Sequence, residues 1–88
     1  MKILKFGAVW CSGCLVMKPR WKEIEEENPD LKAEYFDVDE HPELVEQYKI
    51  EDFPTFIFLS KNDDEVHREV GEVSKKKLLE LIEKYKNL

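Results

Sequence analysis

The residues of this chain with the clearest chemistry are its two cysteines, which stand three positions apart in the stretch Trp10–Cys14. Exchange between thiols and disulfides requires a thiolate, and an ordinary cysteine with a pKa of about 8.5 supplies little of it at neutral pH. The free backbone N–H groups at a helix N-terminus favour an anion, and a helical pattern starts at Cys11. We therefore predict that Cys11 is an acidified nucleophile. Cys14 is close enough to close a small disulfide ring with it, and we expect Cys14 to lie tucked under the first turn as the resolving sulfur.

The composition of the chain is that of a soluble globular protein with a single domain, residues 1–88. A formal net charge of -6 and a pI near 4.9 argue against nucleic acid, which requires a basic patch. The apolar run within Met1–Phe6 is short and contains lysines, so we expect neither a secretory signal nor a membrane partner. A close cysteine pair without export signals is typical of a catalytic or metal-binding site in a reducing compartment, and we expect a cytoplasmic monomer.

Hydrophobic periodicity and turn residues predict four strands and three helices in the order βαβαββα. Strand, helix and strand in succession imply a parallel pair with a right-handed crossover, and the last two strands form a hairpin. The predicted fold class is therefore α/β, with a four-stranded mixed sheet and helices on both faces. The predicted strands are Ile3–Gly7, Ala33–Val38, Thr55–Leu59 and Glu65–Val70, and the predicted helices are Cys11–Glu27, Pro42–Tyr48 and one capped by Ser74 with the apolar stripe Leu78, Leu79, Ile82 and Tyr85.

Several short motifs occur in an order that resembles the thioredoxin family, and the resemblance covers essentially all 88 residues. The matching residues are Trp10–Cys14, Pro19 inside the helix, Phe36–Asp39 followed by Pro42, Tyr48–Ile50, Phe53–Thr55 and Val70–Gly71. A single C-x-x-C would be weak evidence, but this ordered set is strong. The resemblance implies a thioredoxin-like fold, without a counterpart for the family's first strand and helix.

The resemblance also implies a mechanism in which Cys11 attacks a protein disulfide and Cys14 resolves the mixed disulfide. The activity would be that of a thiol–disulfide oxidoreductase, with no cofactor of its own. Its partners would be protein disulfide substrates and a thioredoxin reductase or a similar electron donor.

A second part of the resemblance concerns substrate binding. The family's proline at the position of Pro54 is cis and faces the cysteines, and Phe53 before it would offer its backbone edge to an extended substrate segment. Trp10, which we expect both to cover the core and to form part of the rim, and Gly71 after the hairpin complete the expected substrate-binding residues.

Three departures from the family pattern modify these expectations. Ser12 and Gly13 stand between the cysteines where the family usually has Gly-Pro, so the family pattern does not predict the reduction potential of the pair. Lys5 stands where the family has a buried acid, and Gly7 and Tyr35 stand where it often has tryptophan and lysine. We predict that Lys5 acts electrostatically beside Cys14 or is paired with Glu34 or Asp39 beneath the site; the alternative is a buried stem with its amine in water and no role.

The sequence gives weaker support to three alternative functions. His41 and His67 lie far apart and lack the paired spacing of zinc sites, so no metal site is expected, and the acidic residues 37, 39 and 40 are expected to be solvated or capping groups. A glutaredoxin-like enzyme working through glutathione would need more basic residues than Val70–Glu72 offers. A redox-linked binding module without turnover is the remaining alternative.

Overall fold

The computed structural model describes all 88 residues and contains the strands and helices in the predicted order. The elements are β1 (Lys2–Gly7), α1 (Ser12–Glu27), β2 (Lys32–Asp37), α2 (Pro42–Gln47), β3 (Thr55–Leu59), β4 (Glu65–Val70) and α3 (Lys75–Tyr85). Strand β2 begins and ends one residue earlier than predicted. No helix is both long enough and apolar enough to cross a membrane.

The four strands form one mixed sheet with the order β2-β1-β3-β4. Strands β1 and β2 run parallel and are joined through α1, whereas β3 is antiparallel to both β1 and β4. All five residues of β3 are buried, which explains why Thr55–Leu59 is a nearly continuous apolar run. The predicted mixed sheet and its hairpin are confirmed.

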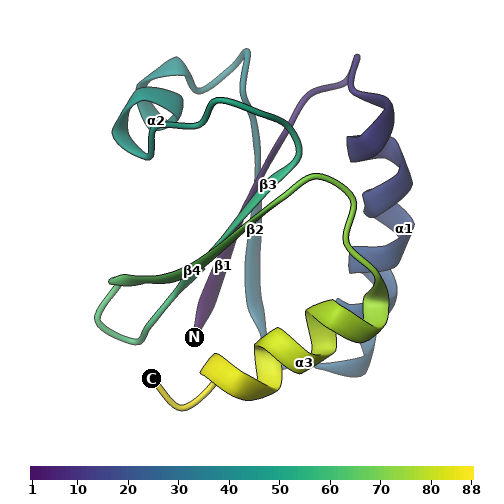
Figure 1. The fold of residues 1–88 in the computed structure, drawn as a ribbon, viewed down its shortest axis with the longest axis vertical. Helices are drawn as coiled ribbons and strands as arrows, with labels where there is room; N and C mark the ends of the chain where they lie inside the picture. The colour runs from purple at the N-terminus through teal and green to yellow at the C-terminus, as the bar shows by residue number, and fades with distance from the viewer.

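Helices cover both faces of the sheet, as Figure 1 shows: α1 and α3 lie on one side and α2 on the other. Side chains alternate along a strand, so β1 contributes Ile3 to the cluster under α1 and α3, and Leu4 and Phe6 to the cluster under α2. Each face therefore has its own buried cluster, and β1 supplies both.

Local sequence signals account for the ends of the helices. Cys11 has extended backbone angles and forms the N-cap of α1, and the hydroxyl of Ser74 caps α3 by accepting a hydrogen bond from the Lys77 N–H at 3.1 Å. Helix α1 continues unbroken through Pro19. The apolar stripe of α3 differs slightly from the prediction, because Leu81 is buried, whereas Leu79 is only partly buried.

Candidate redox site

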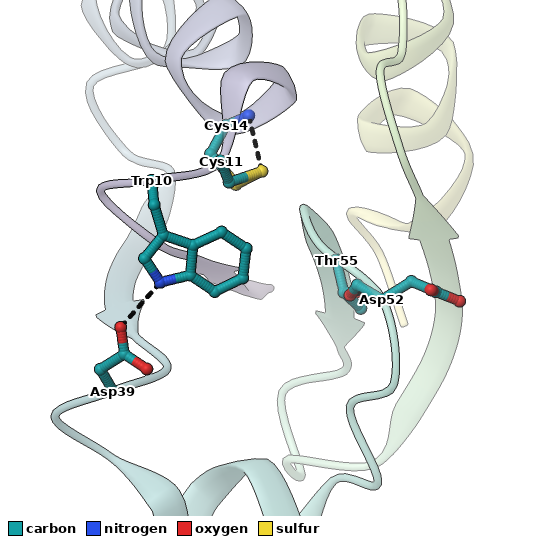
Figure 2. Close-up of a disulfide and its surroundings, with 6 residues drawn as sticks. All are labelled: Trp10, Cys11, Cys14, Asp39, Asp52 and Thr55. Atoms are coloured by element: carbon teal, nitrogen blue, oxygen red, sulfur yellow. Dashed lines mark hydrogen bonds between the residues drawn. A yellow bond between two sulfur atoms is a disulfide. The ribbon is translucent and has the colours of Figure 1, made fainter.

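The site is built on the junction between β1 and α1, where Cys11 and Cys14 form a disulfide with their Cα atoms 5.2 Å apart. Because Cys11 is the N-cap residue, its sulfur lies over the first turn of α1. The backbone N–H of Cys14 donates a hydrogen bond to the Cys11 Sγ at 3.2 Å (Figure 2). A thiolate at this position would accept the same bond and the favourable end of the helix dipole, as the sequence predicts.

The burial of the two cysteines differs from the expectation that Cys14 would be the tucked-in partner. Cys11 is only 9% exposed and packs with Ala8 and Val38 in the cluster under α2. Cys14 is half-buried, and its Sγ packs so closely on Gly7 that a Cβ added to Gly7 would lie 3.1 Å from it. The sulfur expected to be sheltered is therefore on the more open residue.

Pro54 packs against the first turn of α1, beside the cysteine pair. The Phe53–Pro54 peptide bond is cis, as the resemblance implies, and Pro54 is buried against the first turn of α1. A Cβ on Gly13 would lie 3.3 Å from the Pro54 Cδ, so glycine between the cysteines allows the turn and the proline to approach closely. Gly71 donates its N–H to the Pro54 carbonyl at 2.7 Å, and its φ of +89° favours glycine.

An exposed apolar surface surrounds the disulfide. Trp10 is 63% exposed, and its ring packs edge-on against Phe53 with centroids 5.7 Å apart. Its indole N–H donates a hydrogen bond to Asp39 at 2.9 Å (Figure 2). Val9 and Leu15 on either side of the motif are 75% and 59% exposed. Trp10 is thus a fixed part of the rim rather than a cover for the core, and the neighbouring apolar residues are ones that the sequence analysis missed.

Lys5 does not pair with Glu34 or Asp39, and that part of the prediction is wrong. Its amine lies 2.9 Å from the Glu25 carboxylate on α1 and 5.6 Å from the centroid of the Trp21 ring. Lys5 pairs in register with Tyr35 on the α1 side of the sheet, whereas Glu34 is opposite Leu4 and therefore faces the other way.

Asp39 accepts the Trp10 N–H, and Glu34 instead forms an ion pair with Lys2 at 3.0 Å. Glu25 carried no sequence signal, because its contact with Lys5 depends on how α1 crosses the sheet. Lys5 is therefore paired, but with Glu25 rather than with either predicted acid.

Tyr35 lies beside Gly7 on the side of the sheet from which the Cys14 sulfur approaches it. Its Cε1 and hydroxyl would lie 3.1 and 3.2 Å from a Cβ on Gly7, the same point that the Cys14 Sγ approaches. Partial burial, followed by the negative charges of Asp37 and Glu40, raises the pKa of Tyr35. Tyr35 therefore stays protonated at neutral pH.

The remaining titratable candidates lie in local contacts away from the cysteines. His41 lies 3.2 Å from Glu43, and His67 lies 2.7 Å from Glu69. Asp37 caps the loop after β2 by accepting the Asp39 N–H at 2.8 Å, as expected for a capping group.

Comparison with known proteins gives consistent matches. The family model described as Thioredoxin matches residues 1–84. Thioredoxin H5 from Oryza sativa subsp. japonica is 45% identical over 69 residues, which are 78% of this chain and 50% of that protein, so the chain spans about half the length of that relative. Thioredoxin from Ophiophagus hannah is 35% identical over 83 residues, 94% of this chain and 77% of that protein.

Two solved structures show the same fold. Thioredoxin NaTrxh from Nicotiana alata superposes with a TM-score of 0.87 at 31% identity, covering 94% of this chain and 70% of that one. Thioredoxin 1 from Thermosipho africanus superposes with a TM-score of 0.84 at 34% identity, covering 97% and 93%. The arrangement of strands and helices is thus similar to that of these thioredoxins over the parts that superpose.

Proposed function

The chain belongs to the thioredoxin family of thiol–disulfide oxidoreductases, and on that premise we propose that Cys11 and Cys14 are its redox pair and that it reduces disulfides of other proteins. The observation that carries the proposal is the position of the Cys11 sulfur at the N-cap of α1, with the Cys14 N–H donating to it at 3.2 Å. That position stabilises a thiolate at residue 11 without the help of a charged side chain.

The proposed reaction has two steps. The Cys11 thiolate attacks one sulfur of the substrate disulfide, the substrate's second sulfur leaves as a thiolate, and a mixed disulfide forms. The Cys14 thiolate then attacks the Cys11 sulfur, which releases the reduced substrate and leaves the Cys11–Cys14 disulfide. The N-cap position favours the first step, because it raises the population of the Cys11 thiolate.

The surroundings of the pair support a protein substrate. Phe53 makes no backbone hydrogen bond within the chain, so its N–H and carbonyl are free to bind an extended substrate segment. The exposed rings and side chains of Trp10, Val9 and Leu15 would cover apolar residues on both sides of the substrate disulfide. Gly71, whose N–H donates a hydrogen bond to the Pro54 carbonyl, is the last of the proposed substrate-binding residues.

We further propose that the whole chain, residues 1–88, acts as a single-domain monomer in the cytoplasm, where a thioredoxin reductase or a similar donor returns electrons to the pair. The compartment follows from the close pair of cysteines, which suits a reducing environment. Ser12 and Gly13 leave the reduction potential open, and titration of the Cys11–Cys14 couple against glutathione buffers would measure it.

Reduction of insulin by dithiothreitol tests the function. We expect catalysis by the wild type and its loss in Cys11→Ser. In Cys14→Ser we expect a mixed disulfide with insulin to accumulate, because the resolving sulfur is missing. Undiminished turnover in Cys11→Ser would overturn the proposal. A parallel assay with glutathione and hydroxyethyl disulfide separates this activity from the glutaredoxin-like alternative.

A further inference from the structure

One carboxylate lies against the turn between the two cysteines. Glu72, which follows Gly71 in the chain, is exposed to solvent. A Cβ added to Gly13 would lie 3.3 Å from the Pro54 Cδ, 3.6 Å from the Glu72 Cγ and 3.9 Å from the Glu72 Oε2. The carboxylate is therefore at the point where the first turn of α1 meets the cis proline, on the surface that we propose binds the substrate.

The backbone on both sides of Glu72 is held in place. The residue before it donates its N–H to the Pro54 carbonyl at 2.7 Å. The residue after it, Val73, is buried, and its N–H donates a hydrogen bond to the Met17 Sδ at 3.4 Å. The Val73 carbonyl accepts a hydrogen bond from the Arg20 guanidinium at 2.8 Å. Because Met17 and Arg20 both belong to α1, the helix that carries the cysteines also fixes the position of this carboxylate.

The negative charge of Glu72 is not compensated within the chain, since its carboxylate takes part in none of the ion pairs. The basic residues on the neighbouring segments bind elsewhere: Arg20 donates to a backbone carbonyl, and Lys75 lies 2.7 Å from Glu27. Lys18 is exposed more than one helical turn beyond the cysteine motif and forms no ion pair with Glu72. The carboxylate beside the motif is therefore free to bind an incoming cation.

The surface around the motif combines apolar and acidic groups. Val9, Trp10 and Leu15 supply its exposed apolar side chains, and Asp39 accepts the Trp10 N–H at its rim. Glu72 adds a second carboxylate, in a chain whose net charge is -6. Charges on two binding surfaces are generally complementary, so this surface favours a segment that carries both an apolar and a basic side chain.

From the proposed redox function, we infer that Glu72 selects the substrate by binding a lysine or arginine side chain next to the substrate cysteine that Cys11 attacks. In the mixed disulfide the substrate sulfur is bonded to Cys11, the N-cap residue, and Gly13 lies in the turn that follows. The long side chain of a basic neighbour can reach the carboxylate beside that turn, whereas an acidic neighbour would be repelled. The exchange reaction itself is unchanged. The preferred substrates are protein disulfides with a basic residue beside the reactive cysteine.

Peptide disulfides that differ only beside the cysteine test this inference. Three symmetrical disulfide dimers carry lysine, glutamine or glutamate on both sides of the cysteine, in an otherwise identical uncharged segment with blocked ends. Reduced protein is mixed with each dimer at neutral pH, samples are quenched with acid, and chromatography of the released peptide thiol gives the rate. The quantity compared between proteins is the ratio of the rate for the lysine peptide to that for the glutamine peptide. Any change in the reactivity of Cys11 itself cancels in this ratio.

Glu72→Gln removes the charge and keeps the shape of the side chain. Glu26→Gln is the matched control, because it changes the net charge equally and Glu26 is also exposed and outside the ion pairs. Glu26 lies at the other end of α1 from Gly13, at a distance of about 20 Å for a rise of 1.5 Å per residue. That distance is about twice the screening length of roughly 10 Å in 0.1 M salt, so the control reports only the overall charge.

We expect Glu72→Gln to lower the ratio about fourfold, whereas Glu26→Gln should change it by no more than about 1.3-fold. Glu72→Lys should lower it further and accelerate reduction of the glutamate peptide. Raising the salt to about 0.5 M should bring the wild-type ratio toward that of Glu72→Gln. The same ratio in wild type and Glu72→Gln, or an equal fall in Glu26→Gln, would refute the selective role of Glu72.

The glutamine peptide keeps the two proposals apart. If wild type and Glu72→Gln both reduce it and the ratio does not differ between them, the proposed function stands and only the selectivity is refuted. If wild type reduces none of the three peptides, the proposed function fails and the inference fails with it.

Discussion

The two faces of β1 differ, although one strand of six residues forms both. The side facing α2 presents Leu4 and Phe6, which are 4% and 1% exposed, in a continuous apolar cluster. The side facing α1 presents Ile3, then Lys5 paired with Glu25, then Gly7 beside an open pocket. The first face is packed like an ordinary core, and the second becomes more polar and more open toward the cysteines.

This difference shows how a small domain can hold a reactive site without losing its core. Along β1, the Lys5–Glu25 pair and Gly7 lie on the α1 side, whereas the more exposed Lys2–Glu34 pair lies at the start of the strand on the α2 side. Both cysteines pack with the cluster under α2, so the α2 face also contacts the disulfide. Substitutions in the buried cluster should mainly change stability, and a substitution at Gly7 should mainly change the surroundings of Cys14.

The largest expected effect is on the closed face. Phe6→Ala removes a ring that packs against Phe36 and Tyr48 at centroid distances of 5.6 and 5.8 Å, and should lower the free energy of unfolding by about 3–5 kcal/mol. Met17→Ala, in the cluster under α1 and α3, removes a smaller buried side chain and should cost about 2 kcal/mol. Urea denaturation measures both, and a greater loss for Met17→Ala would contradict the comparison.

The next effect concerns the open face and depends on redox state. Gly7→Ala brings a Cβ within 3.1 Å of the Cys14 Sγ and of the Tyr35 ring. The disulfide fixes the sulfur, whereas a free Cys14 thiol can rotate away, so the variant should destabilise the oxidised form about 1 kcal/mol more than the reduced form. The reduction potential should rise by about 20 mV, measured against glutathione buffers. An unchanged or lower potential would show that the neighbouring side chains move to make room for the added Cβ in the oxidised form.

Lys5→Met should have a smaller effect. The variant removes the contact with Glu25, which is 34% exposed in its side chain, and should lower the free energy of unfolding by about 0.5–1 kcal/mol. Lys5→Met leaves the Glu25 carboxylate unpaired, so the pKa of the Cys14 thiol and the turnover should be compared in Lys5→Met/Glu25→Gln, which removes both charges and should leave them unchanged. Lys2→Met, which breaks a more exposed pair, is the stability control and should have almost no effect. A raised Cys14 pKa in the double variant would restore the electrostatic role predicted from sequence.

The smallest effect lies at the edge of the closed face. Arg68 donates to Glu65 at 2.8 and 2.9 Å and to the Tyr48 carbonyl at 2.8 Å, and its guanidinium lowers the pKa of Glu65. Because the folded pKa lies below the unfolded one, this stabilisation is present above the unfolded pKa and is lost as the pH falls through the folded pKa. Glu65→Gln should cost less than about 1 kcal/mol at pH 7, and its difference from wild type should fade between about pH 5 and pH 3 in urea titrations. A pH-independent difference would contradict the ion-pair explanation.

Sequence patterns predicted much of this architecture because the relevant signals are local. The alternation in β1, the cap at Ser74, the apolar run of β3 and the cysteine motif at a helix start each depend on residues within one turn or strand. The assignment of Lys5 failed because its partner lies twenty residues away on another element. Which acid reaches it depends on the side of the sheet to which each strand residue points and on the path of α1.

By itself, the sequence determined the chemistry: two thiols one turn apart, at a position where a helix begins and its free N–H groups favour a thiolate. It also determined the order of the elements, since periodicity and turn residues act locally. Only the tertiary structure decided which cysteine is the more buried residue, because burial depends on the space between elements. In this fold Ala8 and Val38 pack with Cys11, while Cys14 packs on Gly7 at the wall of a pocket.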